Sequence, residues 1–192
     1  MARLFCGVGF NTKGKYSIKE DGKSSRCYTV WRNMIKRCYS EAEQKRVPTY
    51  IGCTVSDEWH DFQNFAEWYT NHDYYGLGYD VDKDLLVRGN KVYSKETCSL
   101  VPPRINTLLT NLSGTRSKRL TGVTYIENKG LFQARIRSSG LMRNLGFFET
   151  EAQAHQAYIK SKEKLVKMAA LEHRYDMDEA VFNALMGWRF YE

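Results

Sequence analysis

The sequence has no apolar run of about 18 residues, the length that a membrane-spanning helix needs, so we expect no membrane partner. Its first residues also lack the long apolar stretch of a secretion signal, which predicts a cytoplasmic protein. The five cysteines are irregularly spaced and form no Cys-x-x-Cys pair, which argues against a zinc ribbon or a redox motif and favours reduced, mostly buried thiols. A zinc site formed by Cys27, Cys38, Cys53 and a histidine is the alternative.

What the chain has in excess is positive charge. Its 192 residues include 29 Lys and Arg against 22 Asp and Glu, for a net charge of +7 and a pI near 9.1. Residues 118–170 contain ten Lys or Arg and four Glu, so this segment alone carries +6. Basic charge clustered in one module is the expected footprint of phosphate binding, so we expect a polyanion as partner. The length suggests one or two domains.

Residues 120–148 alternate between apolar and polar side chains, as strands do. The predicted middle strand has an apolar face with Phe132, Ala134 and Ile136, and a polar face with Gln133, Arg135 and Arg137. In the third strand, the apolar face is predicted to hold Leu145 and Phe147, and the polar face Met142 and Asn144.

An amphipathic helix is predicted to follow these strands. Thr150 and Gln153 have the spacing of a capping box at its start. Its predicted apolar stripe consists of Ala154, Ala157, Tyr158, Leu165 and Met168. The fold class is therefore α+β, with a three-stranded antiparallel sheet that packs one face on a helix and leaves the arginine face open.

These motifs, Thr121-Gly122-Val123 followed by residues 132–137, 145–151 and 154–158, resemble the Apetala/ethylene-response-factor DNA-binding domain, copies of which also occur in phage and homing endonucleases. The resemblance covers residues 120–170 and implies that the sheet enters the major groove of double-stranded DNA. Arg137 falls on a DNA-contact position of the family. Arg135 and Asn144 fall on contact positions where the plant members have Glu and Trp, so the plant target sequence is not carried over.

The remaining segments complete the predicted plan. Residues 113–119 are small, polar and basic without periodicity, which predicts a linker after a first module over residues 1–112. One more helix is predicted over residues 171–192, and we expect it to pack back on one of the modules. The chain is expected to be a monomer or a weak dimer. The predicted DNA-binding residues are Gln133, Arg135, Arg137, Arg143 and Asn144 in the sheet, and Arg116, Lys118 and Arg119 at the linker.

In the first module, residues 28–39 predict a helix whose core face holds Trp31, Met34, Ile35 and Cys38. Ser56 is predicted to cap a second helix, with an apolar stripe of Trp59, Phe62, Phe65, Ala66 and Tyr69.

Residues 80–106 are the candidate catalytic segment. A strand over 80–87, a tight turn at Gly89-Asn90, a returning strand at 91–93, an extended segment at 98–101 and a helix opened by Pro102 or Pro103 are expected. This order brings a carboxylate and an amide oxygen within reach of one divalent cation, and such oxygen ligands suit Mg²⁺ or Mn²⁺.

The same segment resembles the ββα-metal core of HNH endonucleases, especially those encoded by phages and introns. The motifs are Val81-Asp82-Lys83, Gly89-Asn90 and residues 98–106, and they place Asp82 and Asn106 on the metal-ligand positions. Lys83 falls on the position of the general-base histidine. An ordinary lysine has a pKa of about 10.4 and is protonated at neutral pH, so it cannot take a proton from water. Either Lys83 is an atypical base or a phosphate contact, or it pairs with a neighbouring aspartate; His60 and His72 are alternative bases.

Three functions therefore remain open. The first is a phage-type, metal-dependent DNA endonuclease, acting in the host cytoplasm if the chain is encoded by a phage, that nicks DNA or acts like a homing enzyme. The second is a DNA-binding protein with a degenerate HNH module. The third is a phage inhibitor that binds an acidic host or defence protein through its basic face.

Overall fold

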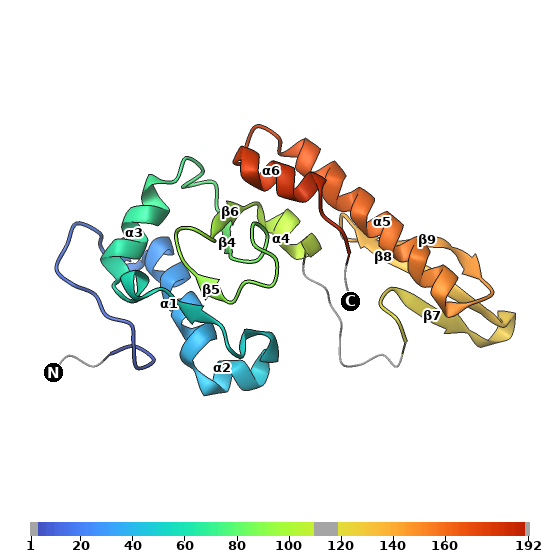
Figure 1. The fold of residues 1–192 in the computed structure, drawn as a ribbon, viewed down its shortest axis with the longest axis horizontal. Helices are drawn as coiled ribbons and strands as arrows, with labels where there is room; N and C mark the ends of the chain where they lie inside the picture. The colour runs from blue at the N-terminus through green and yellow to red at the C-terminus, as the bar shows by residue number, and fades with distance from the viewer. Residues whose placement is uncertain (1–3, 110–118, 191–192) are drawn as a thin grey trace. The chain divides into compact units, whose positions relative to one another are not determined.

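The computed structural model describes residues 4–109 and 119–190 and has a mixed α+β fold (Figure 1). The described chain divides into two compact units at Pro102–Pro103, upstream of the predicted linker. We refer to residues 4–102 as unit 1 and to the described residues from 103 onward as unit 2. In the described part of the chain, no helix is both long and apolar enough to cross a membrane.

Unit 1 contains short strands, three α-helices and two 3-10 helices. Its elements are β1 (Lys19–Glu20), β2 (Lys23–Ser24), α1 (Arg26–Tyr39), α2 (Glu41–Arg46), η1 (Pro48–Tyr50), β3 (Thr54–Val55), η2 (Asp57–His60), α3 (Phe62–Asn71), β4 (Asp80–Asp82), β5 (Val92–Tyr93) and β6 (Ser99–Val101). Helix α1 begins after Ser25, whose side chain accepts a hydrogen bond from the Tyr28 amide.

The core of unit 1 lies between α1 and α3 and is rich in aromatic rings. The predicted core face of α1 is confirmed, because Trp31, Met34, Ile35 and Cys38 are all buried. The indole of Trp31 also donates a 2.8 Å hydrogen bond to the Trp59 carbonyl, so this buried polar group is satisfied.

The predicted helix cap at Ser56 is wrong. Residues after Ser56 form the short η2, and the α-helix itself starts at Phe62. Asp61 is the actual cap, because its side chain accepts a hydrogen bond from the Gln63 amide while Ser56 makes no such bond. Trp59 therefore reaches the core from η2 and not from α3.

The predicted return of β5 against β4 is also wrong. β4 ends at Asp82 and pairs antiparallel with β6, whereas β5 pairs parallel with β3. The reason is local: Asp82 Oδ1 accepts hydrogen bonds from the amides of Asp84 and Leu85, which turns the chain out of the strand.

Unit 2 contains α4 (Pro103–Leu109), β7 (Val123–Ile126), η3 (Glu127–Lys129), β8 (Leu131–Ser138), β9 (Leu141–Phe148), α5 (Glu151–Glu172) and α6 (Glu179–Met186). The three strands form one antiparallel sheet in the order β7-β8-β9, and α5 lies along one of its faces (Figure 1). The capping box formed by Thr150 and Gln153 is confirmed by hydrogen bonds in both directions.

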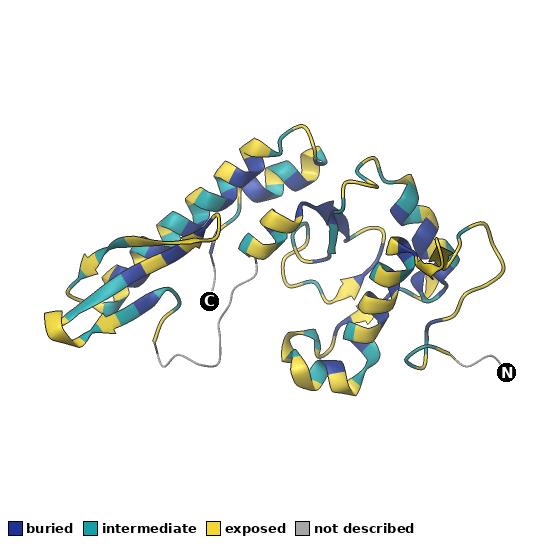
Figure 2. Cartoon of the chain, turned by 180° about the vertical axis from the view of Figure 1, so that it is seen from behind, coloured by how far each residue is buried: buried dark blue, intermediate teal, exposed yellow. Residues whose placement is uncertain are grey.

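Four of the five predicted stripe residues of α5, Ala154, Ala157, Tyr158 and Leu165, pack in the core, and Met168 does not. Ala154 and Tyr158 are buried against the sheet, but Met168 is 45% exposed. In the second half the buried positions are Lys162, Val166, Ala169 and Ala170, and this part of α5 also packs against α4 and α6 (Figure 2). The set of buried residues of α5 therefore changes from its first half to its second half as its packing partners change.

A β-bulge in β9 changes which face its side chains occupy. Ala134 of β8 pairs with Gly146 and Arg135 pairs with Asn144, so Leu145 is an extra residue on β9. Gly146 has a φ of +132°, a conformation that glycine tolerates and that side chains rarely adopt. Leu145 packs in the core as predicted, but Phe147 falls opposite Gln133, on the face that α5 does not cover. The predicted core position of Phe147 is thus wrong, and Phe148 packs there instead.

Candidate nucleic-acid interface and candidate metal site

The sheet face opposite α5 carries the main candidate interface, which we call the open face. Strand register places nine side chains on it, namely Thr124, Ile126, Leu131, Gln133, Arg135, Arg137, Met142, Asn144 and Phe147. Arg135 pairs with Asn144 and Arg137 pairs with Met142, and all four of these residues are exposed. The structure therefore brings Gln133, Arg135, Arg137 and Asn144 together on one face, as their alternation predicts.

The two arginines of the open face differ in how they are held. The Arg135 guanidinium donates a 3.1 Å hydrogen bond to Thr124 Oγ1 on the neighbouring strand, which orients it over the sheet. The Asn144 side chain accepts a 3.2 Å hydrogen bond from the Gly146 amide at the bulge. The Arg137 guanidinium makes no hydrogen bond or ion pair with another described residue, so it can turn its donors toward a ligand.

Two exposed apolar side chains also lie on this face: Met142 is there as predicted, whereas Phe147 was predicted on the other face. Phe147 is 38% exposed and Met142 is 52% exposed. The Lys129 ammonium lies 4.0 Å from the centre of the Phe147 ring, a cation–π distance. Only the bulge puts Phe147 here, and a bulge has no clear signature in a single strand's sequence.

Arg143 and Arg119 do not belong to the open face. Arg143 pairs with Ile136, whose side chain is buried on the α5 side of the sheet. Arg119 lies 3.5 Å from the Glu151 carboxylate and over the ring of Phe132, which is also on the α5 side. Plain strand alternation puts Arg143 on the side opposite Met142 and Asn144, so its predicted role in DNA binding stays a prediction that the open face does not support. Arg116 and Lys118 lie outside the described residues.

Asp82 is the centre of the candidate metal site. Its Oδ1 accepts amide hydrogen bonds of 2.8 Å from Asp84 and 2.7 Å from Leu85, which fix the orientation of the carboxylate. Its Oδ2 accepts no hydrogen bond from the described part of the chain. Burial raises the pKa of the Asp82 carboxyl, and the two amide hydrogen bonds partly offset this effect. A carboxylate oriented in this way has one oxygen left for a cation.

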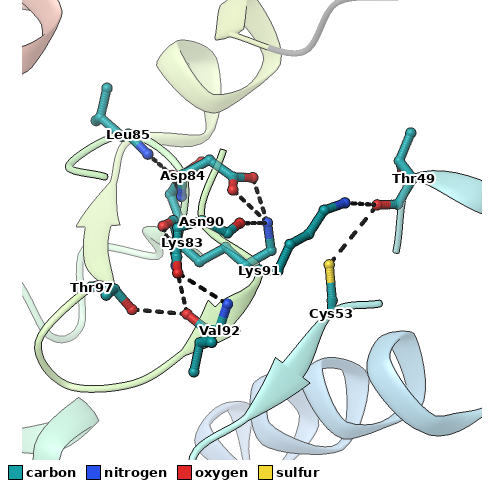
Figure 3. A network of polar contacts seen from close by, with 10 residues as sticks. Thr49, Cys53, Lys83, Asp84, Leu85, Asn90, Lys91, Val92 and Thr97 are labelled. Atoms are coloured by element: carbon teal, nitrogen blue, oxygen red, sulfur yellow. Dashed lines mark hydrogen bonds and ion pairs between the residues drawn. The ribbon is translucent and has the colours of Figure 1, made fainter. Parts of the chain in front are cut away.

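Lys83 is buried and fully committed to its own loop (Figure 3). Its ammonium lies 2.6 Å from both carboxylate oxygens of Asp84 and 3.0 Å from the Asn90 carbonyl oxygen. Three acceptors use the three N–H donors of the ammonium. Of the two sequence interpretations, pairing with a neighbouring aspartate is the one that these contacts favour, and the role of a general base stays a prediction that they oppose.

Asn90 closes the loop that contains Lys83. Its side-chain amide donates to the carbonyls of Lys83 and Val92, and its side-chain oxygen accepts from the Val92 amide at 3.1 Å (Figure 3). The turn predicted at Gly89-Asn90 is therefore present, but it serves to clamp the loop between β4 and β5 rather than to form a hairpin of those two strands.

The predicted metal pair is divided between the two units. Asp82 ends β4 in unit 1, whereas Asn106 lies on α4, which belongs to unit 2. Within unit 1, the residue opposite Asp82 on β6 is Ser99, which is buried. Among the described residues no group of three or more His, Cys, Asp or Glu side chains is placed to hold a metal ion, so the alternative zinc site at Cys27, Cys38 and Cys53 is not formed.

The two candidate base histidines are engaged with aromatic side chains. His60 Nε2 lies 3.2 Å from the Tyr39 hydroxyl, and its Nδ1 lies 3.8 Å from the Asp57 carboxylate. His72 follows the last residue of α3, and its ring contacts those of Trp68 and Tyr74. Both rings are thus engaged by neighbouring side chains, and the role of either histidine as a base stays a prediction.

All five cysteines are free thiols, and four of them are buried. Burial raises the pKa of Cys27, Cys38 and Cys98 to about 12, so these thiols stay protonated and unreactive at neutral pH.

Comparison of the chain with known protein families, with curated proteins and with solved structures finds no match.

Proposed function

We propose that the protein is a DNA endonuclease of the phage or intron type. In this proposal the open face of unit 2 binds double-stranded DNA, and unit 1 hydrolyses a phosphodiester bond with Mg²⁺ or Mn²⁺ held in part by Asp82. The observation that carries it is the open face, on which Arg135, Arg137 and Asn144 are exposed and adjacent in register.

The chemistry of the open face matches the major groove of DNA. That groove admits a two-stranded β-ribbon, and its base edges pair with arginine at guanine and with asparagine at adenine. Arg137 has its donors free for a base edge, and Arg135 is already oriented by Thr124. The charge of +6 over residues 118–170 adds attraction to the phosphates.

The cleavage part of the proposal rests on Asp82. Along the chain β4 is followed by β5, β6 and α4, and β4 pairs antiparallel with β6; this order supports the resemblance to the ββα-metal nucleases. Bound there, a divalent cation supplies polarisation of the scissile phosphate and neutralises the leaving oxygen. The carboxylate of Asp82 fits a hard cation because Mg²⁺ binds through one or two carboxylates and keeps several waters.

A second candidate function is a DNA-binding protein without catalysis. Lys83 favours it, because an ammonium that donates to Asp84 and Asn90 has no lone pair with which to accept a proton. Unit 1 would then serve as a scaffold. The third candidate is binding to an acidic protein, in which the open face contacts a protein surface instead of DNA.

DNA binding is tested by measuring the affinity of the full chain for a labelled duplex over a range of salt concentrations. Neutralisation of phosphates predicts a steep linear loss of log affinity with log salt. Arg137→Ala should weaken binding by about 1–3 kcal/mol. Arg143→Ala is the matched control, because it removes the same charge from the other side of the sheet. Equal losses in the two variants would show that the open face does not select the DNA.

Cleavage is tested with supercoiled plasmid and either Mg²⁺ or Mn²⁺, scored for nicked and linear products with and without chelator. Asp82→Asn should abolish metal-dependent cleavage and leave DNA affinity unchanged. Glu41→Gln is the control, since Glu41 is an exposed carboxylate at the start of α2 in the same unit. Binding with no cleavage by the unaltered chain would leave the non-catalytic candidate, and equal cleavage by both variants would remove Asp82 from the site.

A further inference from the structure

The open face has two chemically different ends. One end carries Arg135, Arg137 and Asn144, together with Met142 opposite Arg137. The other carries three apolar side chains, because Ile126 pairs with Leu131 across β7 and β8 and Phe147 lies opposite Gln133 on β9. Lys129 stands beside Phe147, so the apolar end also has a positive charge that a phosphate can meet.

The apolar end has no role in the core of unit 2. Val123, Ala134 and Ala154 form the buried cluster on the α5 side, and Phe148 rather than Phe147 packs against it. Phe147 keeps 38% of its surface exposed beside the polar side chains that the proposed function assigns to DNA. A large apolar ring held at this place offers an apolar group of a ligand a surface to contact.

In the major groove the one apolar group on a base edge is the methyl group of thymine, which is read by contact with side chains such as phenylalanine. We propose that Phe147 recognises the methyl group of a thymine, while Arg137 at the other end of the face reads a guanine. This inference rests on the proposed binding of duplex DNA and adds to it which bases the two ends select.

The spacing of these two bases follows from the register of the sheet. Phe147 lies beside Gln133, and Arg137 is four residues further along β8. A strand rises by about 3.3 Å per residue, which separates the two side chains by about 13 Å. At about 3.4 Å per base pair, that distance corresponds to about four base pairs when the strands follow the groove.

The bulge in β9 is what places Phe147 on the same face as Arg137. Without the extra Leu145, the alternation of β9 would turn Phe147 toward α5 and leave the end of the face beside Gln133 without a ring. With it, Asn144 and Phe147 both lie on the open face, although they are three residues apart.

The test is selection of duplexes from a randomised pool by the full chain, followed by affinity measurements on the selected duplex. The expected consensus has a guanine and a thymine about four base pairs apart. Phe147→Ala should lose the thymine and keep the guanine, whereas Arg137→Ala should do the reverse. Both changes are at exposed side chains, and the melting temperature of each variant verifies that the sheet is intact.

Deoxyuridine, which lacks only the methyl group of thymine, gives the decisive comparison. Replacing the selected thymine by deoxyuridine should weaken binding by the unaltered chain about fourfold, the factor expected for one buried methyl group. The same replacement should not affect Phe147→Ala. Equal affinity of the unaltered chain for the two duplexes, or thymine enrichment that persists in Phe147→Ala, would overturn the inference while DNA binding itself stands. A pool that enriches no sequence would also overturn it, and absence of any salt-dependent DNA affinity would remove the proposed function as well.

Discussion

Gly122 is the position at which one added methyl group should do the most damage to unit 2. It has a φ of +78°, and a Cβ added to it would lie 2.1 Å from Cδ2 of Tyr158. Tyr158 cannot move away easily, because it is buried and its ring packs edge-on against Phe190 with the centroids 5.6 Å apart. The Gly122 carbonyl also accepts a 2.8 Å hydrogen bond from the Arg135 amide, which ties the start of β7 to β8.

The magnitude for Gly122→Ala has two parts. A left-handed backbone conformation costs a residue with a Cβ about 1–2 kcal/mol. Forcing an extra carbon into a packed site costs about 1–3 kcal/mol more. We therefore expect the free energy of unfolding of unit 2 to fall by about 2–5 kcal/mol.

Gly130→Ala is the matched control. Gly130 has a φ of +64°, but no atom lies within 4 Å of the position that a Cβ would take there, so only the backbone part of the cost applies. We expect it to lower the free energy of unfolding by about 1–2 kcal/mol.

Urea denaturation combined with amide hydrogen exchange measures both variants, because exchange in β8 reports on unit 2 and exchange in α1 reports on unit 1. Faster exchange is expected in β8 and unchanged exchange in α1. Equal losses for Gly122→Ala and Gly130→Ala, or an equal effect on both units, would refute the steric argument.

Three further predictions concern buried titratable groups. Lys83→Met should lower the free energy of unfolding of unit 1 by about 1–3 kcal/mol, because Asp84 and the Asn90 carbonyl lose their donor; an unchanged urea midpoint would argue against the clamp. Burial lowers the pKa of Lys162 in the folded chain below its ordinary value of 10.5. Between the folded and the unfolded pKa the unfolded chain binds more protons, so the free energy of unfolding rises as pH increases through this range. Lys162→Met should therefore stabilise by about 0.5–2 kcal/mol at pH 7, with a melting-temperature gain that shrinks toward pH 10, and a gain independent of pH would contradict this. Because burial raises the pKa of Cys98 to about 12, its thiol should react with a disulfide reagent at pH 8 only after unfolding in urea. Prompt labelling of Cys98 in the native protein would contradict its burial.

Sequence reasoning succeeded where structure is set by neighbours along the chain. The capping box at Thr150 and Gln153 needs only three residues of spacing, and the core face of α1 follows from helical periodicity. The alternation of β8 correctly separates Ala134 and Ile136 from Arg135 and Arg137. The concentration of positive charge in residues 118–170 is likewise a property of composition alone.

Tertiary structure decided everything that depends on a partner distant in sequence. A bulge exists only relative to a paired strand, so the open-face position of Phe147 was invisible in β9 alone. β5 pairs with β3, which lies far from it along the chain, and no local pattern predicts that partner. Likewise, α4 belongs to unit 2 and not to the unit of the strands that precede it. Charge and periodicity are local, whereas register, pairing and the partners of a buried lysine depend on which segments meet in space.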